Sequence, residues 1–369
     1  MDAPGSSPPS IPAKPPSRTR QVVQGLITLA VLVLVFGFVL PRLADYREVL
    51  DYIGQIGAAE WVLLIVLAAA VLLAYMLVLM AAMPSLRFGE AYIAQTTAQA
   101  VNNTLPAGGA IALPLQYAIY MSWGFTPEAV TAMFLAVGIW DQFARFGLPI
   151  LALSIASITQ STPWWTWAIA FGGVALVVTA ILVVRAIFSR EEAARRLASV
   201  LDRWANRALH LIKRPAIDVA GSVMRFRSNA IGVVQRGWRR ITVTTLMNHA
   251  AQAGLFLASV RAVGIGRDQI PTVWVIASFA VGRLLTMIPV SPGGLGLVDL
   301  GWIGLLTLGW QGGTADNDLI TAATLLYRAL TYLPPIPLGA ISWVAYRMNR
   351  RRRRDWRIAR RGEWDAIAP

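Results

Sequence analysis

The first candidates for chemistry are ionisable side chains inside long apolar segments, namely Asp141, Arg145, Arg283, Asp299 and Arg328. A charged group at the centre of a bilayer costs about 3 kcal/mol or more, and it typically faces the protein interior or a wet cavity. Asp141 stands four residues before Arg145, the order that favours an ion pair on one helix face. We expect this pair either to neutralise itself as a structural element or to gate a cavity.

Two of the arginines have no acidic neighbour in the sequence. Arg283 and Arg328 therefore need a partner on another helix or on a ligand, and Asp299 is a candidate partner for one of them. Because one guanidinium would then remain, the sequence predicts a net positive site within the membrane.

Glycine and proline interrupt two of the apolar segments, and the second interruption resembles the start of a helix. Ser291 can cap it, and Pro292 occupies the first turn. Amides and the dipole at a helix start attract anions, phosphate included. Glycines also let membrane helices approach closely; this reading is favoured for the first interruption and the anion site for the second. The residues expected to bind a lipid phosphate are Arg283, Arg328, Ser291, Gly293, Gly294, Gly108 and Gly109.

Composition indicates an integral membrane protein. Of the 369 residues, 56% are hydrophobic and 14% are charged, and the mean hydropathy is +0.56. Soluble domains carry about 25% charged residues. The chain has no cysteine and two histidines, which excludes disulfides, thiol nucleophiles and metal sites built from several such residues. No nucleotide-binding loop occurs, so we expect no cofactor and no metal.

The apolar segments predict an all-α, polytopic fold with about six full spans, because a spanning helix needs about 20 apolar residues. These spans are 24–40, 61–83, 128–155, 164–184, 241–263 and 319–346, and Pro334, Pro335 and Pro337 interrupt the last of them. The broken segments 91–121 and 272–310 are predicted to be re-entrant helical hairpins, since irregular backbone at membrane depth needs protein or a polar cavity around it. Two short spans or one kinked span are the alternative for each.

Basic residues set the expected orientation and divide the chain. We expect a disordered cytoplasmic arm over 1–20, a first membrane half over 21–187 and a basic amphipathic cytoplasmic linker over 188–240. A second membrane half over 241–346 and an arginine-rich cytoplasmic tail over 347–369 follow. The tail suits anionic lipid headgroups, and positive-inside topology explains the net charge of +14 without nucleic acid. A homo-oligomer is compatible with this architecture.

Gly-Gly and Leu-Pro pairs recur at the same spacing in the two halves. Gly293-Gly294 follow Gly108-Gly109 by 185 positions, and Leu333-Pro334 follow Leu148-Pro149 by the same interval. Each half therefore consists of a span, a broken hairpin and a span. Parity places the first hairpin on the cytoplasmic side and the second on the outside, which predicts an inverted repeat of the kind found in secondary transporters.

The same motifs carry a family resemblance. The stretch from Ile288 to Asp299 has the sequence IPVSPGGLGLVD, with Arg283 before it and Leu326-Tyr327-Arg328 after it; it resembles the signature of the lysylphosphatidylglycerol synthase membrane-domain family. The first-half sequence NTLPAGG, which ends at Gly109, resembles that family's upstream motif. The family usually has Glu at the position of Asp299, so the departure keeps a carboxylate.

The resemblance implies a multi-pass protein of the bacterial plasma membrane. In two-domain members the membrane part moves an aminoacylated phospholipid between leaflets, and a soluble domain synthesises it. We expect no such soluble domain after residue 346, so synthase activity is not expected.

The resulting hypothesis is a flippase for a phosphate-bearing lipid, with Asp299 orienting an arginine and Asp141 with Arg145 gating the cavity. Two alternatives stay open: a membrane-embedded transferase with Asp299 or Asp141 as the base, and a non-catalytic scaffold that recruits partners through the arginine tail.

Overall fold

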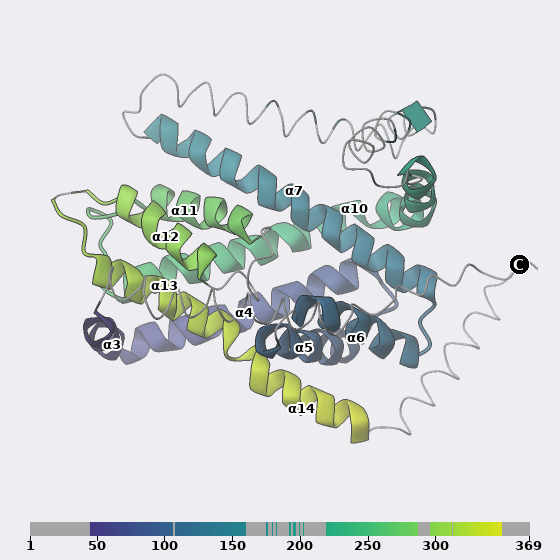
Figure 1. Ribbon diagram of the computed structural model, residues 1–369, viewed down its shortest axis with the longest axis horizontal. Coiled ribbons are helices and arrows are strands. Elements are labelled where there is room, and N and C mark those ends of the chain that lie inside the picture. The colour runs from purple at the N-terminus through teal and green to yellow at the C-terminus, as the bar shows by residue number, and fades with distance from the viewer. Residues whose placement is uncertain are drawn as a thin grey trace, which may run out of the picture.

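The fold is all-helical in the part of the chain that the computed structural model describes, which is 45–105, 108–159, 219–286, 296–311, 313–348 and isolated positions between 175 and 202 (Figure 1). Its helices are α3 (Tyr46–Gly54), α4 (Ala58–Ala82), α5 (Phe88–Thr104), α6 (Gly108–Ser122), α7 (Pro127–Thr159), α10 (Val219–Ala262), α11 (Thr272–Leu285), α12 (Leu297–Leu308), α13 (Asn317–Tyr332) and α14 (Pro335–Met348).

Two of these helices are long and apolar enough to cross a membrane. They are Ala58–Ala82, with a mean hydropathy of 3.1, and Pro127–Ala152, with 1.2. They correspond to the spans predicted at 61–83 and 128–155. The outer face of α4 exposes apolar side chains, with Val62 62% and Leu63 52% exposed, a surface that suits lipid. The spans predicted at 24–40 and 164–184 lie outside the described residues, apart from isolated positions.

The other two predicted spans differ from expectation. Helix α10 begins at Val219, so the second part of the linker expected over 188–240 and the span expected at 241–263 form one continuous helix. No proline interrupts this stretch. The span expected at 319–346 is divided into α13 and α14 at Leu333 and Pro334, because proline removes a backbone donor within a helix.

Each broken segment forms two helices that pack against each other, α5 with α6 and α11 with α12. In the first hairpin, a Cβ atom on Gly108 would lie 2.5 Å from the carbonyl oxygen of Val101. Only glycine allows the start of α6 to lie this close to the end of α5. The turns themselves, 106–107 and 287–295, lie outside the described residues. Each broken segment thus consists of two helices, and its re-entrant course and depth in the membrane stay predictions.

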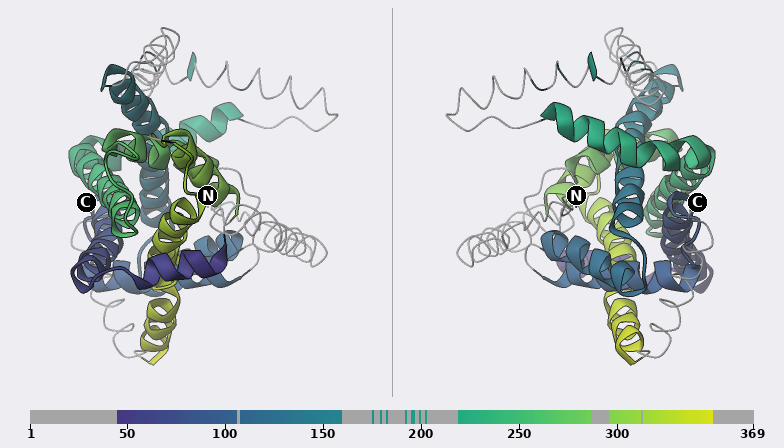
Figure 2. Two further views of the ribbon diagram at one scale, coloured as in Figure 1. Left: turned by 90° about the vertical axis from the view of Figure 1, so that its left-hand side faces the viewer. Right: turned by 90° about the vertical axis from the view of Figure 1, so that its right-hand side faces the viewer.

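The hairpins contact the closing helix of the opposite half. Helix α14 packs on α5, as Figure 1 and Figure 2 show, and α11 packs on α7. At the first contact, a Cβ on Gly339 would lie 2.2 Å from the Thr96 carbonyl oxygen, and the Thr96 hydroxyl donates to Ser342 at 2.8 Å. At the second, Ala152 packs between Ala277 and Ala280. These two contacts, each between a hairpin and the last helix of the other half, fit the predicted repeat. The inverted orientation of the repeat stays a prediction.

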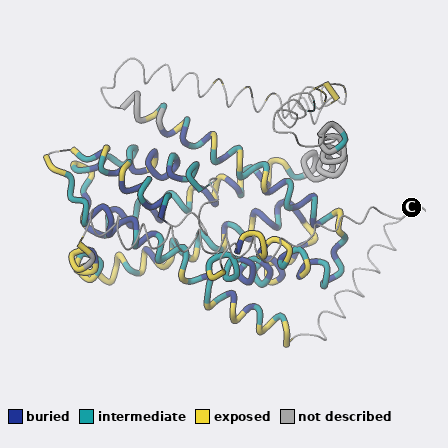
Figure 3. Tube along the Cα trace, in the orientation of Figure 1, coloured by how far each residue is buried: buried dark blue, intermediate teal, exposed yellow. Residues whose placement is uncertain are grey.

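Helix α4 contributes to both apolar cores of the molecule, and Figure 3 shows buried positions distributed over the helices. One core lies among α4, α5, α6 and α7. The other lies among α3, α4, α10, α11, α12 and α13 and contains a group of large aromatic side chains. That second core positions the candidate site.

Candidate functional site

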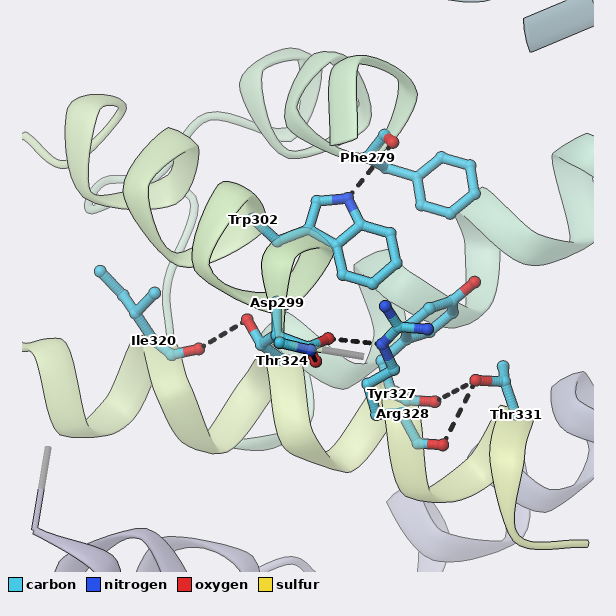
Figure 4. A network of polar contacts seen from close by, with 9 residues as sticks. Phe279, Asp299, Trp302, Ile320, Thr324, Tyr327, Arg328 and Thr331 are labelled. Atoms are coloured by element: carbon cyan, nitrogen blue, oxygen red, sulfur yellow. Dashed lines mark hydrogen bonds and ion pairs between the residues drawn. The ribbon is translucent and has the colours of Figure 1, made fainter. Parts of the chain in front are cut away.

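An ion pair between α12 and α13 forms the centre of the candidate site (Figure 4). Asp299 is fully buried and accepts a hydrogen bond from the Nε of Arg328. Its other oxygen accepts the backbone N–H of Gly296 at 2.8 Å, which caps the start of α12. Gly296 has a φ of +89°, a conformation that glycine adopts readily. One carboxylate thus neutralises an arginine and starts the helix, which confirms Asp299 as the partner of one of the two arginines.

A cluster of aromatic side chains beside this ion pair contacts Arg328. The Arg328 guanidinium lies over the Trp302 ring at 4.9 Å, within the range of a cation–π contact. Trp302 Nε1 donates to the Phe279 carbonyl at 3.3 Å, and Tyr327 packs edge-on to Trp302 at 5.2 Å. A Cβ on Gly282 would lie 2.0 Å from Trp302 Nε1, so glycine at this position of α11 makes room for the indole.

Arg283, at the end of α11, is the arginine of the predicted set that forms no ion pair among the described residues. Its Nε is buried and has no hydrogen-bond partner among the described residues. The guanidinium lies within electrostatic range of two other cations, Arg145 and Arg328, and of Asp141 and Tyr327. The three arginines and the two aspartates of this cluster sum to one excess positive charge when nearby histidine is neutral.

A second ion pair reaches the same end of α11 from α7. Arg145 Nε donates to Asp141 Oδ2 at 2.6 Å, as the four-residue spacing predicts. The same guanidinium donates from a terminal nitrogen to Thr286 Oγ1 at 2.6 Å. His249 of α10, only 2% exposed, forms a hydrogen bond of 3.1 Å through Nε2 with Asp141 Oδ1. The pair is therefore joined to α10 and α11.

The structure brings five of the predicted residues into one region: Asp141, Arg145, Arg283, Asp299 and Arg328. Ser291, Gly293 and Gly294 lie outside the described residues, and their contribution stays a prediction. Gly108 and Gly109 begin α6 in the other hairpin, where close helix contact explains Gly108. Their phosphate contact also stays a prediction.

Sequence reasoning missed the partners that organise this region, chiefly His249, Thr286 and Trp302. His249 carried a usable signal, because it is an ionisable side chain within a predicted span. Thr286 and Trp302 are ordinary residues of apolar helices, and only the packing of α11 against α7 and α12 shows what they contact.

Amide side chains form hydrogen bonds within the first hairpin and from it to α13. Gln116 of α6 donates to Gln95 of α5 at 2.8 Å, and Gln95 donates onward to Gln99 at 3.2 Å. Asn103, at the end of α5, donates to the Tyr332 carbonyl of α13 at 2.9 Å. These neutral groups satisfy one another across helices, as expected for polar residues between membrane helices.

Comparison with known proteins agrees with the resemblance seen in the motifs. No individually curated protein matches the chain. The family model described as the lysylphosphatidylglycerol synthase TM region matches residues 22–339, which is most of the chain and includes both hairpins. The chain is therefore a helical membrane protein that belongs to the lysylphosphatidylglycerol synthase transmembrane-region family.

Proposed function

We propose that this protein is a translocator that moves a phosphate-bearing lipid between the leaflets of the bacterial plasma membrane. The observation that carries the proposal is Arg283, whose buried Nε has no partner among the described residues and which lies near two other arginines. Membership of a family named for a lipid synthase supports lipid as the substrate class.

The energetics of Arg283 favour a bound anion. A buried donor without a partner costs about 1–3 kcal/mol, and more when it is charged. Asp299 is engaged by Arg328 and by the Gly296 amide, and Asp141 is engaged by Arg145 and His249. The carboxylates of the cluster are thus already used, and a phosphodiester is the anion that a membrane supplies in quantity.

The residues around Arg283 have separate parts in this proposal. Arg283 binds the lipid phosphate directly, and Arg328 lies ready beside it, held by Asp299 and Trp302. Arg145 binds Thr286 at the end of α11. Its ion pair with Asp141 determines whether Arg145 can also bind the phosphate. Gly293, Gly294, Gly108 and Gly109 remain the proposed backbone contributors to phosphate binding. The termini lie in the cytoplasm, and the arginine-rich tail contacts anionic headgroups.

The test is leaflet exchange in vesicles. Purified protein is reconstituted into liposomes that contain a fluorescent phospholipid, and a membrane-impermeant quencher reports how fast label leaves the inner leaflet. The wild-type protein should accelerate exchange. Arg283→Gln should slow it at least about tenfold, the effect of losing roughly 1.4 kcal/mol of binding in the rate-limiting complex. Arg283→Lys should retain part of the rate, because it keeps the charge and loses the planar fork.

A matched control removes a different arginine. Arg347, at the end of α14, stacks on Trp343 at 5.0 Å, away from the second hairpin. Arg347→Gln should exchange lipid like the wild-type protein. Equal rates for Arg283→Gln and the wild-type protein would reject the assignment, and a new covalent lipid product would instead favour a transferase.

A further inference from the structure

A hydrogen-bonded network links three helices through one histidine. His249 of α10 contacts Asp141 of α7, Asp141 binds Arg145, and Arg145 donates to Thr286 at the end of α11. The Thr286 hydroxyl in turn donates to the Arg283 carbonyl at 2.6 Å. The network therefore begins at a titratable side chain and ends at the residue proposed to bind phosphate.

The hydrogen bond fixes which nitrogen of His249 takes up a proton. An ionised carboxylate only accepts hydrogen bonds, so Nε2 carries the hydrogen toward Asp141 and Nδ1 is the basic nitrogen. Imidazole is the side chain whose ordinary titration falls between pH 5 and 8. The Asp141 and Arg145 side chains are 25% and 21% exposed, so this end of the network is only partly buried.

The helices that pack on α10 bring no second group that titrates in this range. Helix α4 contributes Tyr75, which lies within electrostatic range of Asp141, Arg145 and Arg283. Helix α7 contributes Asp141 and Arg145, and α11 contributes Arg283. Helix α13 contributes Tyr327 and Arg328, both within range of Arg283. Tyrosine and arginine ordinarily titrate above pH 9 and aspartate below pH 5.

We propose that His249 is a proton-binding site whose protonation releases Arg145 from Asp141 to bind lipid phosphate, which makes the proton the coupling ion of the translocator. When His249 is neutral, Asp141 and Arg145 cancel each other's charge. When His249 is protonated, Asp141 is shared between two cations, its hold on Arg145 weakens, and the region gains one positive charge. The lipid-binding half of this inference depends on the proposed function.

Binding linkage makes the idea measurable. If a proton on His249 strengthens anion binding, the bound anion must strengthen proton binding by the same factor. The probe is dihexanoyl phosphatidylglycerol, a soluble phosphodiester that keeps one negative charge from pH 5.5 to pH 8.0. Its affinity for the full-length protein in detergent is measured by calorimetry at both pH values.

The wild-type protein should bind the probe about fivefold or more tightly at pH 5.5 than at pH 8.0, the lower end of typical coupling between sites. His249→Gln keeps a donor toward Asp141 and cannot titrate, so its affinity should be the same at both pH values. The matched control is His210→Gln, which changes the chain's other histidine and should keep the wild-type pH dependence. An unchanged pH dependence in His249→Gln, or none in the wild-type protein, would overturn the inference.

A second measurement does not depend on the folding of His249→Gln. In the His210→Gln protein with a histidine-free tag, ¹⁵N-labelled histidine gives one imidazole, and the bound probe should move the midpoint of its protonation to higher pH. A midpoint that the probe leaves unchanged would also overturn the inference.

Leaflet exchange across the same pH range separates the two proposals. Exchange at a pH-independent rate with unlinked binding would reject proton coupling and leave the translocator in place. Proton-linked binding without leaflet exchange would reject the translocator and retain the His249 site.

Discussion

The two broken hairpins share a frame and differ in their polar content. Each consists of two helices packed together, and each lies on the closing helix of the opposite half. In the hairpin α5–α6 the amides Gln95 and Gln116 bind each other, and the buried carboxylate of Glu90 at the start of α5 accepts the Arg87 backbone N–H. The hairpin α11–α12 carries charged side chains, and Arg283 is left with a buried Nε that no described residue binds.

We infer from this difference that the amides of α5–α6 serve helix packing and that the charged side chains around α11–α12 serve ligand binding. Neutral amides that satisfy one another fix helices at little electrostatic cost. A buried positive charge is costly unless an anion pairs with it. We infer that both helix pairs contribute to the frame and that the charged side chains of the proposed ligand site come from the α11–α12 pair and the helices packed on it.

The largest expected effect comes from removing the carboxylate that the second hairpin depends on. Asp299→Asn leaves Arg328 buried without its counter-charge, and loss of one partner of a buried pair costs about 3–5 kcal/mol. The midpoint of thermal unfolding in detergent should therefore fall sharply. Arg328→Gln in the same chain should restore part of the loss, because both charges are then gone. An unfolding midpoint equal to the wild-type value would show that the pair contributes nothing to stability.

The next effect tests the close approach in the first hairpin. Gly108→Ala places a methyl group 2.5 Å from a backbone oxygen, and overpacking of this kind costs about 1–3 kcal/mol. Gly138→Ala is the matched control, since a Cβ there meets nothing within 4 Å. It should be neutral or slightly stabilising, because alanine suits a helix interior better than glycine. Equal unfolding midpoints for the two variants would remove the steric account of Gly108.

A smaller effect sharpens the contrast between the hairpins. Gln116→Met keeps the volume of the buried side chain and removes its hydrogen bond to Gln95, which should cost about 1 kcal/mol. Lipid exchange in vesicles should continue at nearly the wild-type rate, whereas Arg283→Gln should slow it. If the loss of exchange in Gln116→Met matches that in Arg283→Gln, then the first hairpin is part of the ligand site as well.

The smallest effect lies at the far end of the second half, where α3 meets α13. A hydrogen bond with Asp318, and the negative charges of Asp318, Asp45 and Asp316, raise the pKa of Glu48 above its ordinary 4.5. Because the folded state favours the protonated form, the stability that this group contributes is present below pH 4.5 and is lost as the pH rises. Glu48→Gln should therefore unfold at a slightly higher temperature than the wild-type protein at pH 7 and at the same temperature at pH 4. A difference that grows on acidification would contradict this sign.

The sequence predicts the helical segments, the two breaks and the Asp141–Arg145 pair, because these depend on local spacing and on glycine and proline. It also offers Asp299 as a partner for either Arg283 or Arg328, and the structure shows the ion pair with Arg328. It does not predict that Arg145 reaches Thr286 on α11, since that contact arises where the hairpin of one half lies on the closing helix of the other. For the same physical reason the structural role of Trp302 is not readable from local pattern.

The ends of the last helices are a second feature that the sequence does not predict fully. Apolar length alone predicts one span over 319–346, whereas Pro334 divides it and α14 turns to lie on α5. The tight contact of Gly339 with Thr96 holds that arrangement, and it involves residues far apart in the chain.

The most direct measurement of the central claim is a cryo-electron microscopy map of the protein in nanodiscs that contain phosphatidylglycerol. The account predicts phosphate density within hydrogen-bonding distance of the Arg283 guanidinium, at the end of α11 and within the membrane slab. Density for Arg283 bound to one of the chain's own carboxylates, or facing bulk water, with no phosphate beside it, would contradict the account.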